Sequence, residues 1–480
     1  MTQPQLTDFY TILPFTILVV WACLLLLVDL YIPKGRKSIT AFLAAFGLAG
    51  TMGFAITQTG LSSTGFNNMV FLDGFSTYAN MLLLISGLLG IAVAHGYNKR
   101  MGIERGEYYT LLLLSVSGMM LMAQAADLII VFLALELLSI PLYVLAAFTR
   151  KLESEEAGVK YFLLGAFATG FVVYGTALVF GATGTTSLTG IFLAASSGTS
   201  GLLLTIGAAL ILVGFGFKVA AVPFHMWTPD VYQGAPTSVT AFMSSGAKIA
   251  GFVALLRVFA TAFPSISADL TGILWAMSAI TMIVGNFVAI SQTNIKRMLA
   301  YSSIAHAGYI LMAFVPYGNK DVLPVSIAAG LFYLLTYVLT NFGAWAVVIS
   351  LEKAEGKGLE LSDYAGLSRK YPALAAAMTV FMLSFIGFPP TLGMVGKFYL
   401  FRAVIAGGFN SLAVIGVVTS LISAYYYLRV VVNMYMRDGD PVAEREPGLA
   451  FTTSITAIAT VVLSFIPQWL FLLASTALLR

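Results

Sequence analysis

Apolar residues run in long blocks along nearly the whole chain, and short polar stretches separate these blocks. Each block has about 20 residues, the number that a helix needs to cross roughly 30 Å of hydrocarbon in a bilayer. No strand pattern is evident. The predicted fold class is therefore all-α, a polytopic membrane protein with about 14 transmembrane helices. The fourteen predicted spans lie near residues 11–30, 39–58, 74–95, 108–124, 127–148, 158–182, 201–222, 237–261, 269–291, 298–315, 323–350, 372–405, 409–436 and 450–476.

Basic residues in the loops give an independent test of this count, because Lys and Arg gather on the cytoplasmic side of a membrane protein. With fourteen spans, the even-numbered loops hold only Lys320, and a missed or added span would mix the two sets. We therefore predict a multi-pass membrane protein with both termini on the non-cytoplasmic side. The odd-numbered loops hold Lys34, Arg36, Lys37, Lys99, Arg100, Arg105, Arg150, Lys151, Lys296, Arg297, Lys353, Lys357, Arg369, Lys370, Arg437 and Arg445.

The first apolar block, from Ile12 to Leu30, follows a leader without Lys or Arg and is longer than the apolar part of a signal peptide. We expect it to be a retained span. The chain has no separate soluble domain in this interpretation. It forms one membrane domain over residues 1–480.

Composition excludes several other classes of function. Of the 480 residues, 59% are hydrophobic and 10% are charged, with a mean hydropathy of +0.92, whereas globular domains carry about 25% charged residues. The single cysteine, Cys23, excludes disulfides within the chain and sites held by several thiolates. The three histidines lie far apart in sequence and suggest no haem pair or metal cluster. The net charge of +4 resides in short loops, so it does not indicate nucleic acid.

Four lysine and glutamate residues inside the predicted spans are not explained by a position near a span end. Glu136 and Lys248 lie near the middle of spans five and eight, Lys218 lies in the cytoplasmic half of span seven, and Lys397 lies in span twelve. A charged group at a helix centre costs roughly 2.5–3.5 kcal/mol, so the four together cost on the order of 10 kcal/mol before pairing. Ion pairs between helices are one explanation. For Lys218, reaching the cytoplasmic surface is another, unless the helix continues beyond Pro223.

A proton-carrying function explains the imbalance of these charges. One glutamate cannot neutralise three lysines, so at least some lysines must be neutral part of the time or lie in hydrated cavities. A group that alternates between the two forms carries a proton. Glu136, by approaching or withdrawing, would act as the switch. Four further cations near span ends are expected only to reach the membrane surface: Arg257, Arg402, Arg429 and Lys160.

His306 lies in the middle of span ten. Histidine changes its charge near neutral pH, so His306 could bridge Lys248 and Lys397 in a relay. The alternative is a histidine hydrogen-bonded to backbone or to nearby hydroxyl groups. Those hydroxyls belong to Ser302, Ser303 and Tyr309.

Prolines predict two broken helices, which a membrane tolerates only inside protein or beside a wet cavity. Span seven ends in Pro223 and Pro229, and span twelve contains Pro389 and Pro390. Because spans seven and twelve are five apart, we predict two inverted five-helix repeats, spans 4–8 and 9–13. The corresponding segments are three N-terminal helices (1–107), a first repeat (108–261), a second repeat (269–436) and a C-terminal helix (450–480).

Three motifs then give a resemblance. The segments PFHMWTPDVYQGAPTSVTAF (Pro223–Phe242), QTNIKRMLAYSSIAHAGYI (Gln292–Ile310) and FPPTLGMVGKFYLF (388–401) resemble the antiporter-like proton-channel subunits of complex I, the respiratory NADH:quinone oxidoreductase. The resemblance covers nearly the whole chain and is most similar to the subunit N type. The WTPDVYQGAPT wording and the lysine at position 397 carry that choice.

By matching position, Glu136, Lys218, Lys248 and Lys397 resemble the family's proton-relay residues, and His306 matches less firmly. The resemblance implies that H⁺ arrives from the cytoplasm near Lys218 and Lys248, moves laterally to Lys397 and leaves on the other side. It implies a subunit of a proton-translocating enzyme in a bacterial plasma (inner) membrane, with K and M type subunits among its neighbours. FMN, iron–sulfur clusters and quinone are expected on other partner subunits of that enzyme, with no cofactor in this chain.

Two other functions stay open. A cation/proton antiporter subunit of the Mrp type, or the equivalent subunit of a membrane-bound hydrogenase, would share the same buried charges. A stand-alone solute carrier with a central binding site belongs to a different class. It would transport its substrate without other subunits, and the sequence has few polar residues beyond the lysines to form such a site.

Overall fold

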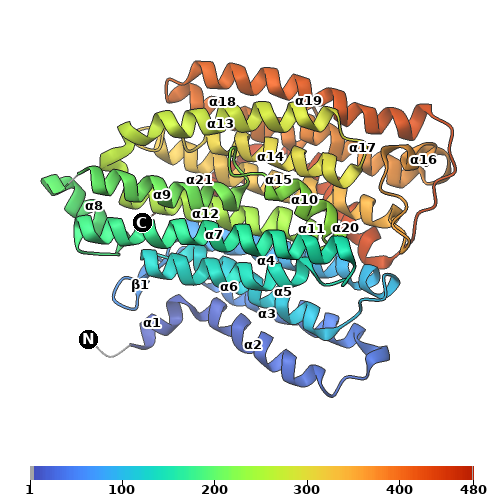
Figure 1. The fold of residues 1–480 in the computed structure, drawn as a ribbon, viewed down its shortest axis with the longest axis horizontal. Coiled ribbons are helices and arrows are strands. Elements are labelled where there is room, and N and C mark those ends of the chain that lie inside the picture. Colours follow the sequence, from blue (N-terminus) through green and yellow to red (C-terminus); the bar gives the residue numbers. More distant parts are fainter. Residues whose placement is uncertain (1–4, 200, 478, 480) are drawn as a thin grey trace.

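A computed structural model describes residues 5–199, 201–477 and 479. The predicted segments 1–107 and 450–480 therefore each include residues outside the described part. The helices run roughly side by side along the long axis of the molecule (Figure 1). The α-helices are α1 (Leu6–Thr11), α2 (Leu13–Asp29), α3 (Ser38–Thr57), α4 (Gly74–Arg100), α5 (Gly106–Gln124), α6 (Leu128–Ala146), α7 (Leu152–Thr183), α8 (Leu188–Ala194), α9 (Leu202–Val219), α10 (Trp227–Gly234), α11 (Thr237–Phe242), α12 (Lys248–Ala262), α13 (Ser267–Ile290), α14 (Ile295–Met312), α15 (Leu323–Leu351), α16 (Leu367–Lys370), α17 (Pro372–Ile386), α18 (Leu392–Ala406), α19 (Asn410–Met436), α20 (Pro447–Val462) and α21 (Pro467–Ser475).

Ten helical segments of the described chain are long and apolar enough to cross a membrane. Each of the fourteen predicted ranges overlaps a helix. Four predicted ranges are not among these ten segments. Helix α2 is too short, and so are α17 and α18, which together fill one predicted range. Helices α5 and α14 contain more polar residues. The chain is thus a helical, multi-pass membrane protein, and the count of fourteen stays a prediction.

A small hairpin contradicts the expectation that no strand is present. Strands β1 (Ser63–Gly65) and β2 (Val70–Leu72) pair antiparallel, with Ser63 opposite Leu72. The turn between them includes Asn67 and Asn68, which both have positive φ angles. Each strand has three residues, too few for an alternating pattern to be visible in the sequence.

Both predicted helix breaks are present. The first break separates α9 from α10. Helix α9 ends at Val219, and the next residue, Ala220, has a left-handed conformation, so the helix does not continue past Pro223. Helix α17 ends at Ile386, and Gly387, with φ of 88°, turns the chain before α18. A third irregularity was not predicted: the π-helical turn η3 (Met243–Ala247) lies directly before α12. The other short helical turns are η1 (Lys34–Arg36), η2 (Ala195–Thr199), η4 (Pro264–Ile266), η5 (Leu361–Tyr364) and η6 (Leu463–Phe465).

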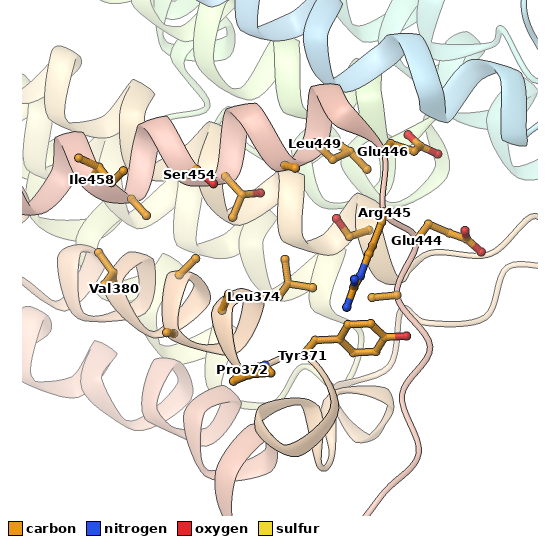
Figure 2. A pocket seen from close by; sticks show the side chains of 18 of the residues that line it. Tyr371, Pro372, Leu374, Val380, Glu444, Arg445, Glu446, Leu449, Ser454 and Ile458 are labelled. Atoms are coloured by element: carbon orange, nitrogen blue, oxygen red, sulfur yellow. The ribbon is translucent and has the colours of Figure 1, made fainter.

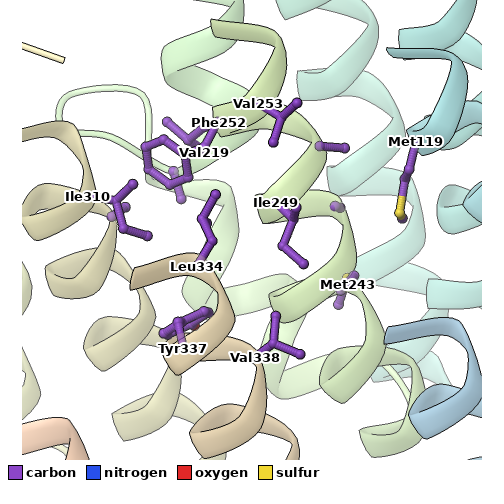
Figure 3. Packing of buried hydrophobic residues seen from close by; sticks show 14 of the residues in the cluster. Met119, Val219, Met243, Ile249, Phe252, Val253, Ile310, Leu334, Tyr337 and Val338 are labelled. Atoms are coloured by element: carbon purple, nitrogen blue, oxygen red, sulfur yellow. The ribbon is translucent and has the colours of Figure 1, made fainter. Parts of the chain in front are cut away.

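Helix α12 lies at the centre of the molecule. The most apolar window of the segment Thr237–Ala262 is buried completely inside the chain. Its Ile249, Phe252 and Val253 pack in the core close to Ile310 of α14 and Leu334 of α15 (Figure 3). A side chain on α12 is therefore shielded by protein, not by lipid.

Arg257 on α12 corrects one of the predictions. It was expected to reach the membrane surface, but its side chain is fully buried. Its guanidinium donates to both carboxylate oxygens of Asp73, at 2.9 and 2.8 Å, and its Nε donates to the carbonyl of Ala123 at 2.9 Å. Asp73 also caps the start of α4. This pair joins α4 to α12 inside the protein. Although Arg257 lies near the end of a predicted span, its side chain therefore contacts protein and not lipid headgroups.

The other three cations expected at the surface differ less from that expectation. Arg402 is exposed. Lys160 is 41% exposed and forms ion pairs with Glu156 and Asp230. Arg429 is partly buried and donates to the carbonyls of Ile290, at 3.0 Å, and Gln292 at the end of the neighbouring α13.

Candidate functional site

Lys218 occupies the last turn of α9 and is buried, with 5% of the residue exposed. Its Nζ donates to Ser139 Oγ of α6 at 2.8 Å and to Tyr161 OH of α7 at 3.4 Å. The surface-reaching alternative for Lys218 is therefore wrong, although the helix ends one residue later. Beside Nζ lies a cavity of about 10 Å³, lined by Ser139, Thr169 and Lys218 among others. Such a volume is close to the least that holds one water molecule.

Glu136 reaches the same cavity indirectly. It is only partly buried, whereas the sequence suggested a buried position. Leu133 and Ile140, three residues before and four residues after it, are about half exposed, so this face of α6 points away from the chain. Glu136 accepts a hydrogen bond of 2.8 Å from Thr169 Oγ1, and Thr169 lines the cavity beside Lys218. The switch pair thus meets through a threonine and not through a direct ion pair.

Lys248 is the first residue of α12, directly after the π-helical turn, and is 2% exposed. Its Nζ donates to the backbone carbonyl and the hydroxyl of Ser303 on α14. Tyr337 on α15 donates to the same hydroxyl at 2.8 Å. The ammonium group also lies 5.7 Å from the centre of the Tyr337 ring. Lys248 is therefore held by Ser303 of α14, whose hydroxyl is itself bound by Tyr337 of α15.

A glycine brings the first two lysines together. Gly251 lies one turn beyond Lys248 on α12, and a Cβ added there would lie 3.3 Å from Cγ of Lys218. The stem of Lys218 therefore packs directly against the helix that carries Lys248.

His306 lies one turn after Ser303 on α14 and is 3% exposed. Its Nδ1 is 2.7 Å from Tyr333 OH of α15, and its Nε2 is 3.1 Å from Tyr427 OH of α19. Its partners are thus tyrosines from other helices, not the nearby hydroxyls considered in the sequence. His306 lies one turn after Ser303, which binds Lys248, and one turn before Tyr309, whose ring centre is 4.5 Å from the Lys397 ammonium. The histidine therefore lies between the contact points of the two lysines on α14 and is hydrogen-bonded on both ring nitrogens.

Lys397 lies on α18, just after the second break, and is 4% exposed. Its Nζ donates to the backbone carbonyls of Phe385 and Ile386, at 2.8 and 2.9 Å, and to Ser420 Oγ of α19 at 2.7 Å. It also lies 4.5 Å from the centre of the Tyr309 ring. The two carbonyls have no partner within α17 because the helix ends there, although Ser420 Oγ also donates to the carbonyl of Ile386 at 2.7 Å. A helix C-terminus carries partial negative charge. The break therefore creates the site that holds the lysine.

A polar column leads away from Lys248, and sequence reasoning missed it. Ser244 and Ser245 precede Lys248 by four and three residues and so lie on its side of the helix. Asn341 of α15 donates to both serine hydroxyls, at 2.7 and 2.8 Å. Both serines and Asn341 are buried. The spacing of two serines and one lysine was the signal in the sequence that could have revealed this arrangement.

Further polar residues lie towards the C-terminal end of α15, which Glu352 follows directly. Tyr108 donates to Ser238 Oγ at 3.0 Å, and Tyr97 donates to Glu352 Oε1 at 3.4 Å. Glu352 is 7% exposed, and its Oε2 has no hydrogen-bond partner among the described residues. Lys296, 3% exposed, donates to the carbonyl of Ala235 at 2.8 Å. Lys296 was assigned to a loop, so its burial could not be predicted from hydropathy.

The three lysines share one property. Among the described residues, none of Lys218, Lys248 and Lys397 forms an ion pair, although nine ion pairs are present elsewhere. Their partners are hydroxyl and carbonyl oxygens, and a hydroxyl can both accept and donate a proton. In the same part of the chain, no three His, Cys, Asp or Glu side chains are placed to hold a metal ion. The arrangement is suited to passing protons between neutral and charged side chains.

Comparisons with known proteins find similar sequences and folds over nearly the whole chain. The family model described as "NADH:quinone oxidoreductase/Mrp antiporter, TM" matches residues 125–423. NADH-quinone oxidoreductase subunit N of Trichlorobacter lovleyi is 48% identical over 442 residues, which cover 91% of this chain and 89% of that protein. A chain of respiratory complex I from Thermus thermophilus is 36% identical, with a TM-score of 0.83, and covers 96% of this chain and 99% of its own length.

The same fold also occurs in an Mrp complex. A chain of the Mrp complex from Dietzia sp. DQ12-45-1b has a TM-score of 0.86 at 21% identity and covers 98% of this chain and 97% of its own length. At that identity the likeness concerns the fold alone.

Proposed function

Because the chain belongs to the NADH:quinone oxidoreductase/Mrp antiporter family of membrane subunits, we propose that it serves as the subunit N of an NADH:quinone oxidoreductase and moves H⁺ across the membrane. It is then one subunit of an enzyme whose FMN, iron–sulfur clusters and quinone belong to other subunits. Electron transfer occurs there, and this chain supplies the proton path.

One observation carries the proposal: three buried lysines without a carboxylate partner in the described residues. A permanently charged lysine in a membrane interior is costly unless it is paired. Each of these lysines is bound only to oxygens of hydroxyl or carbonyl groups. Such a site accommodates both the ammonium and the neutral amine, and alternation between these two forms is what proton transfer requires.

The proposed path runs through α14. Protons reach Lys248 along the column of Glu352, Ser238, Ser244 and Asn341, and the unpartnered Oε2 of Glu352 calls for a water molecule. They then pass from Lys248 towards the hydroxyls around His306.

From His306 the path continues to the exit side. Tyr333 and Tyr427 contact its two ring nitrogens. Lys397 is the last carrier and releases the proton beside the second break.

Lys218 and Glu136 form the proposed control element. Glu136 acts on Lys218 through Thr169 and the small cavity. Because the Glu136 face of α6 points away from the chain, a carboxylate at mid-membrane needs a cover of protein. We assign that cover to a neighbouring subunit of the K type, with an M type subunit elsewhere on the chain.

The finer topology belongs to the same proposal. Fourteen crossings would form two inverted five-helix repeats, with the breaks after α9 and α17 in corresponding positions. Each break lies beside a lysine, as expected for inverted repeats with broken helices. The loop charges then put both termini on the non-cytoplasmic side of a bacterial plasma membrane.

Purification through a tag on this chain tests the assignment. We expect co-isolation of flavin and iron–sulfur subunits, and NADH-driven acidification when the complex is reconstituted in liposomes. Lys248→Ala should leave assembly and NADH oxidation by the peripheral subunits measurable, but should strongly reduce acidification. Co-isolation with small antiporter subunits instead would support the Mrp alternative, and full acidification by the assembled Lys248→Ala complex would refute the relay.

A further inference from the structure

A groove of about 870 Å³ runs between α17 and α20, outside the proton path (Figure 2). Small residues on both helices leave the space open, and its walls are mostly apolar. They include Ala373, Ala376, Ala377, Ala450 and Ala457. The lining on α20 extends from Leu449 to Val462, about 20 Å of helix at 1.5 Å per residue. This length exceeds the roughly 15 Å of one leaflet's hydrocarbon. The groove therefore accommodates an extended alkyl chain.

The mouth of the groove carries charge. Tyr371, Glu444 and Arg445 lie there, and the Arg445 side chain points towards the Tyr371 ring, 5.8 Å from its centre (Figure 2). Glu444 and Arg445 are exposed and have no ion-pair partner in the described chain. Glu446, which also lines the groove, is already paired with Arg100 at 2.6 Å. The mouth thus offers one free guanidinium and one free carboxylate.

Neighbouring loops fix this mouth in place. The backbone N–H of Glu444 donates to the carbonyl of Ser350 at 2.8 Å. Lys370, one residue before Tyr371, pairs with Asp440 on the other loop. The two free charges are therefore held at one end of a long apolar groove.

The geometry points to a bound glycerophospholipid with a zwitterionic, primary-amine headgroup, of the phosphatidylethanolamine type. Its phosphate would meet Arg445, whose planar fork matches phosphate oxygens. Its ammonium would donate to Glu444, and one acyl chain would lie along α20. Tyr371 lies where aromatic residues commonly mark the membrane interface.

Other occupants fit less well. A quinone has an alkyl tail but an uncharged head, so it would leave both charges unused. An anionic lipid would place its extra negative charge near Glu444. A choline headgroup has no N–H to donate to a carboxylate. A neighbouring subunit's helix would fill the groove without requiring two opposite charges at its end.

The test measures lipid retention by the assembled complex. The complex is reconstituted in nanodiscs of equal parts palmitoyl-oleoyl phosphatidylethanolamine, phosphatidylglycerol and phosphatidylcholine, extracted again in detergent and examined by native mass spectrometry. We expect this chain to retain one phosphatidylethanolamine in preference to the other two lipids. No retained lipid, equal retention of all three, or cross-links from Ala457→Cys to a neighbouring subunit's helix would overturn the site.

Four variants sharpen the result. Arg445→Ala should lower retention about tenfold, the loss expected for one charge-assisted hydrogen bond, whereas Arg437→Ala on the same loop should not change it. Glu444→Gln should remove the preference for ethanolamine over glycerol headgroups. Ala457→Phe should fill the groove and abolish retention of every lipid. Unchanged retention in Arg445→Ala would refute the headgroup assignment, and because no proton movement is measured, the outcome is independent of the proposed function.

Discussion

The two breaks hold their lysines in different ways. Lys218 lies before the first break and donates to side-chain hydroxyls of α6 and α7, at 2.8 and 3.4 Å. Lys397 lies after the second break and donates mainly to backbone, to two carbonyls at the end of α17, and to the single hydroxyl of Ser420. A cavity lined by Thr169, the hydrogen-bond partner of Glu136, adjoins Lys218, and in the described residues no carboxylate forms an ion pair with either lysine.

This difference assigns different tasks to similar lysines. Side-chain hydroxyls can rotate and exchange roles as donor and acceptor, so the surroundings of Lys218 can respond to Glu136. Backbone carbonyls cannot donate, and the end of α17 attracts the ammonium of Lys397 with a fixed partial charge. We infer that the first break forms the control element and the second break forms the outlet. The predictions below test this division.

The largest effect is expected at Lys397. Lys397→Ala removes the last carrier and should reduce proton movement through this chain by roughly 100-fold or more, the lower end of what proton-transfer groups contribute. Lys397→Arg should be almost as damaging, because arginine keeps the charge but does not release its proton. The measurement is NADH-driven acidification in liposomes containing the assembled complex. Near-normal pumping by Lys397→Arg would show that the positive charge alone matters, and the outlet assignment would fail.

Glu136→Gln should have the next largest effect. It removes the charge that acts on Lys218 while keeping an oxygen that can accept from Thr169. We expect turnover of the complex to fall about tenfold, equivalent to roughly 1.4 kcal/mol of lost electrostatic interaction. The chain should still assemble, because Glu136 forms no ion pair in the described structure. Unchanged pumping would reduce Glu136 to a structural residue.

The helical, multi-pass character of the chain was predictable because hydropathy reports depth in a membrane, and a run of 20 apolar residues is a strong local signal. The same signal placed Lys218, Lys248 and Lys397 inside the protein. Prolines predicted both breaks, since they cannot continue a helix within a membrane without help from neighbours.

Lateral contacts were not predictable from the same signal. Arg257 binds Asp73, 184 positions earlier, and nothing in either local pattern indicates the other residue. Tyr333 and Tyr427, which hold His306, come from helices that meet α14 only in the folded chain. The exposure of Glu136 depends on which face of α6 packs inward. Hydropathy along the sequence gives the depth of a residue in the membrane, but the neighbours of that residue depend on tertiary packing.

Thr169→Val tests the hydrogen bond that links Glu136 to the cavity, and it should have a smaller effect than Glu136→Gln. Removing one hydroxyl hydrogen bond costs about 1 kcal/mol, so we expect a roughly fivefold fall in turnover. Thr176→Val is the matched control, because Thr176 is buried two turns further along α7 and its hydroxyl bonds only to Val172 of the same helix. Equal effects of the two variants would mean that the loss arises from packing of α7 and not from the switch.

The smallest effect is expected at Asp230, whose ion pairs connect three helices beside the first break. Asp230 on α10 binds Arg297 of α14 at 2.8 Å and Lys160 of α7 at 3.0 Å. Burial alone would raise the pKa of Asp230, but hydrogen bonds from Arg297 and Lys160 outweigh it and hold the pKa below its ordinary value. A carboxyl with a lowered pKa stabilises the folded chain above its ordinary pKa of about 3.9, and this contribution is lost as the pH falls through the lower, folded value.

Asp230→Asn should therefore lower the thermal midpoint of the detergent-purified complex slightly at pH 7, by the loss of exposed ion pairs worth about 0.2–1 kcal/mol each. The difference from the unmodified chain should shrink as the pH falls below about 4. Asp438→Asn is the control, because Asp438 pairs with Arg369 while 86% exposed, and such a pair should contribute nothing measurable. A difference that stays constant with pH would mean that the Asp230 charge does not anchor α10, and the geometry of the first break would then have to arise from packing.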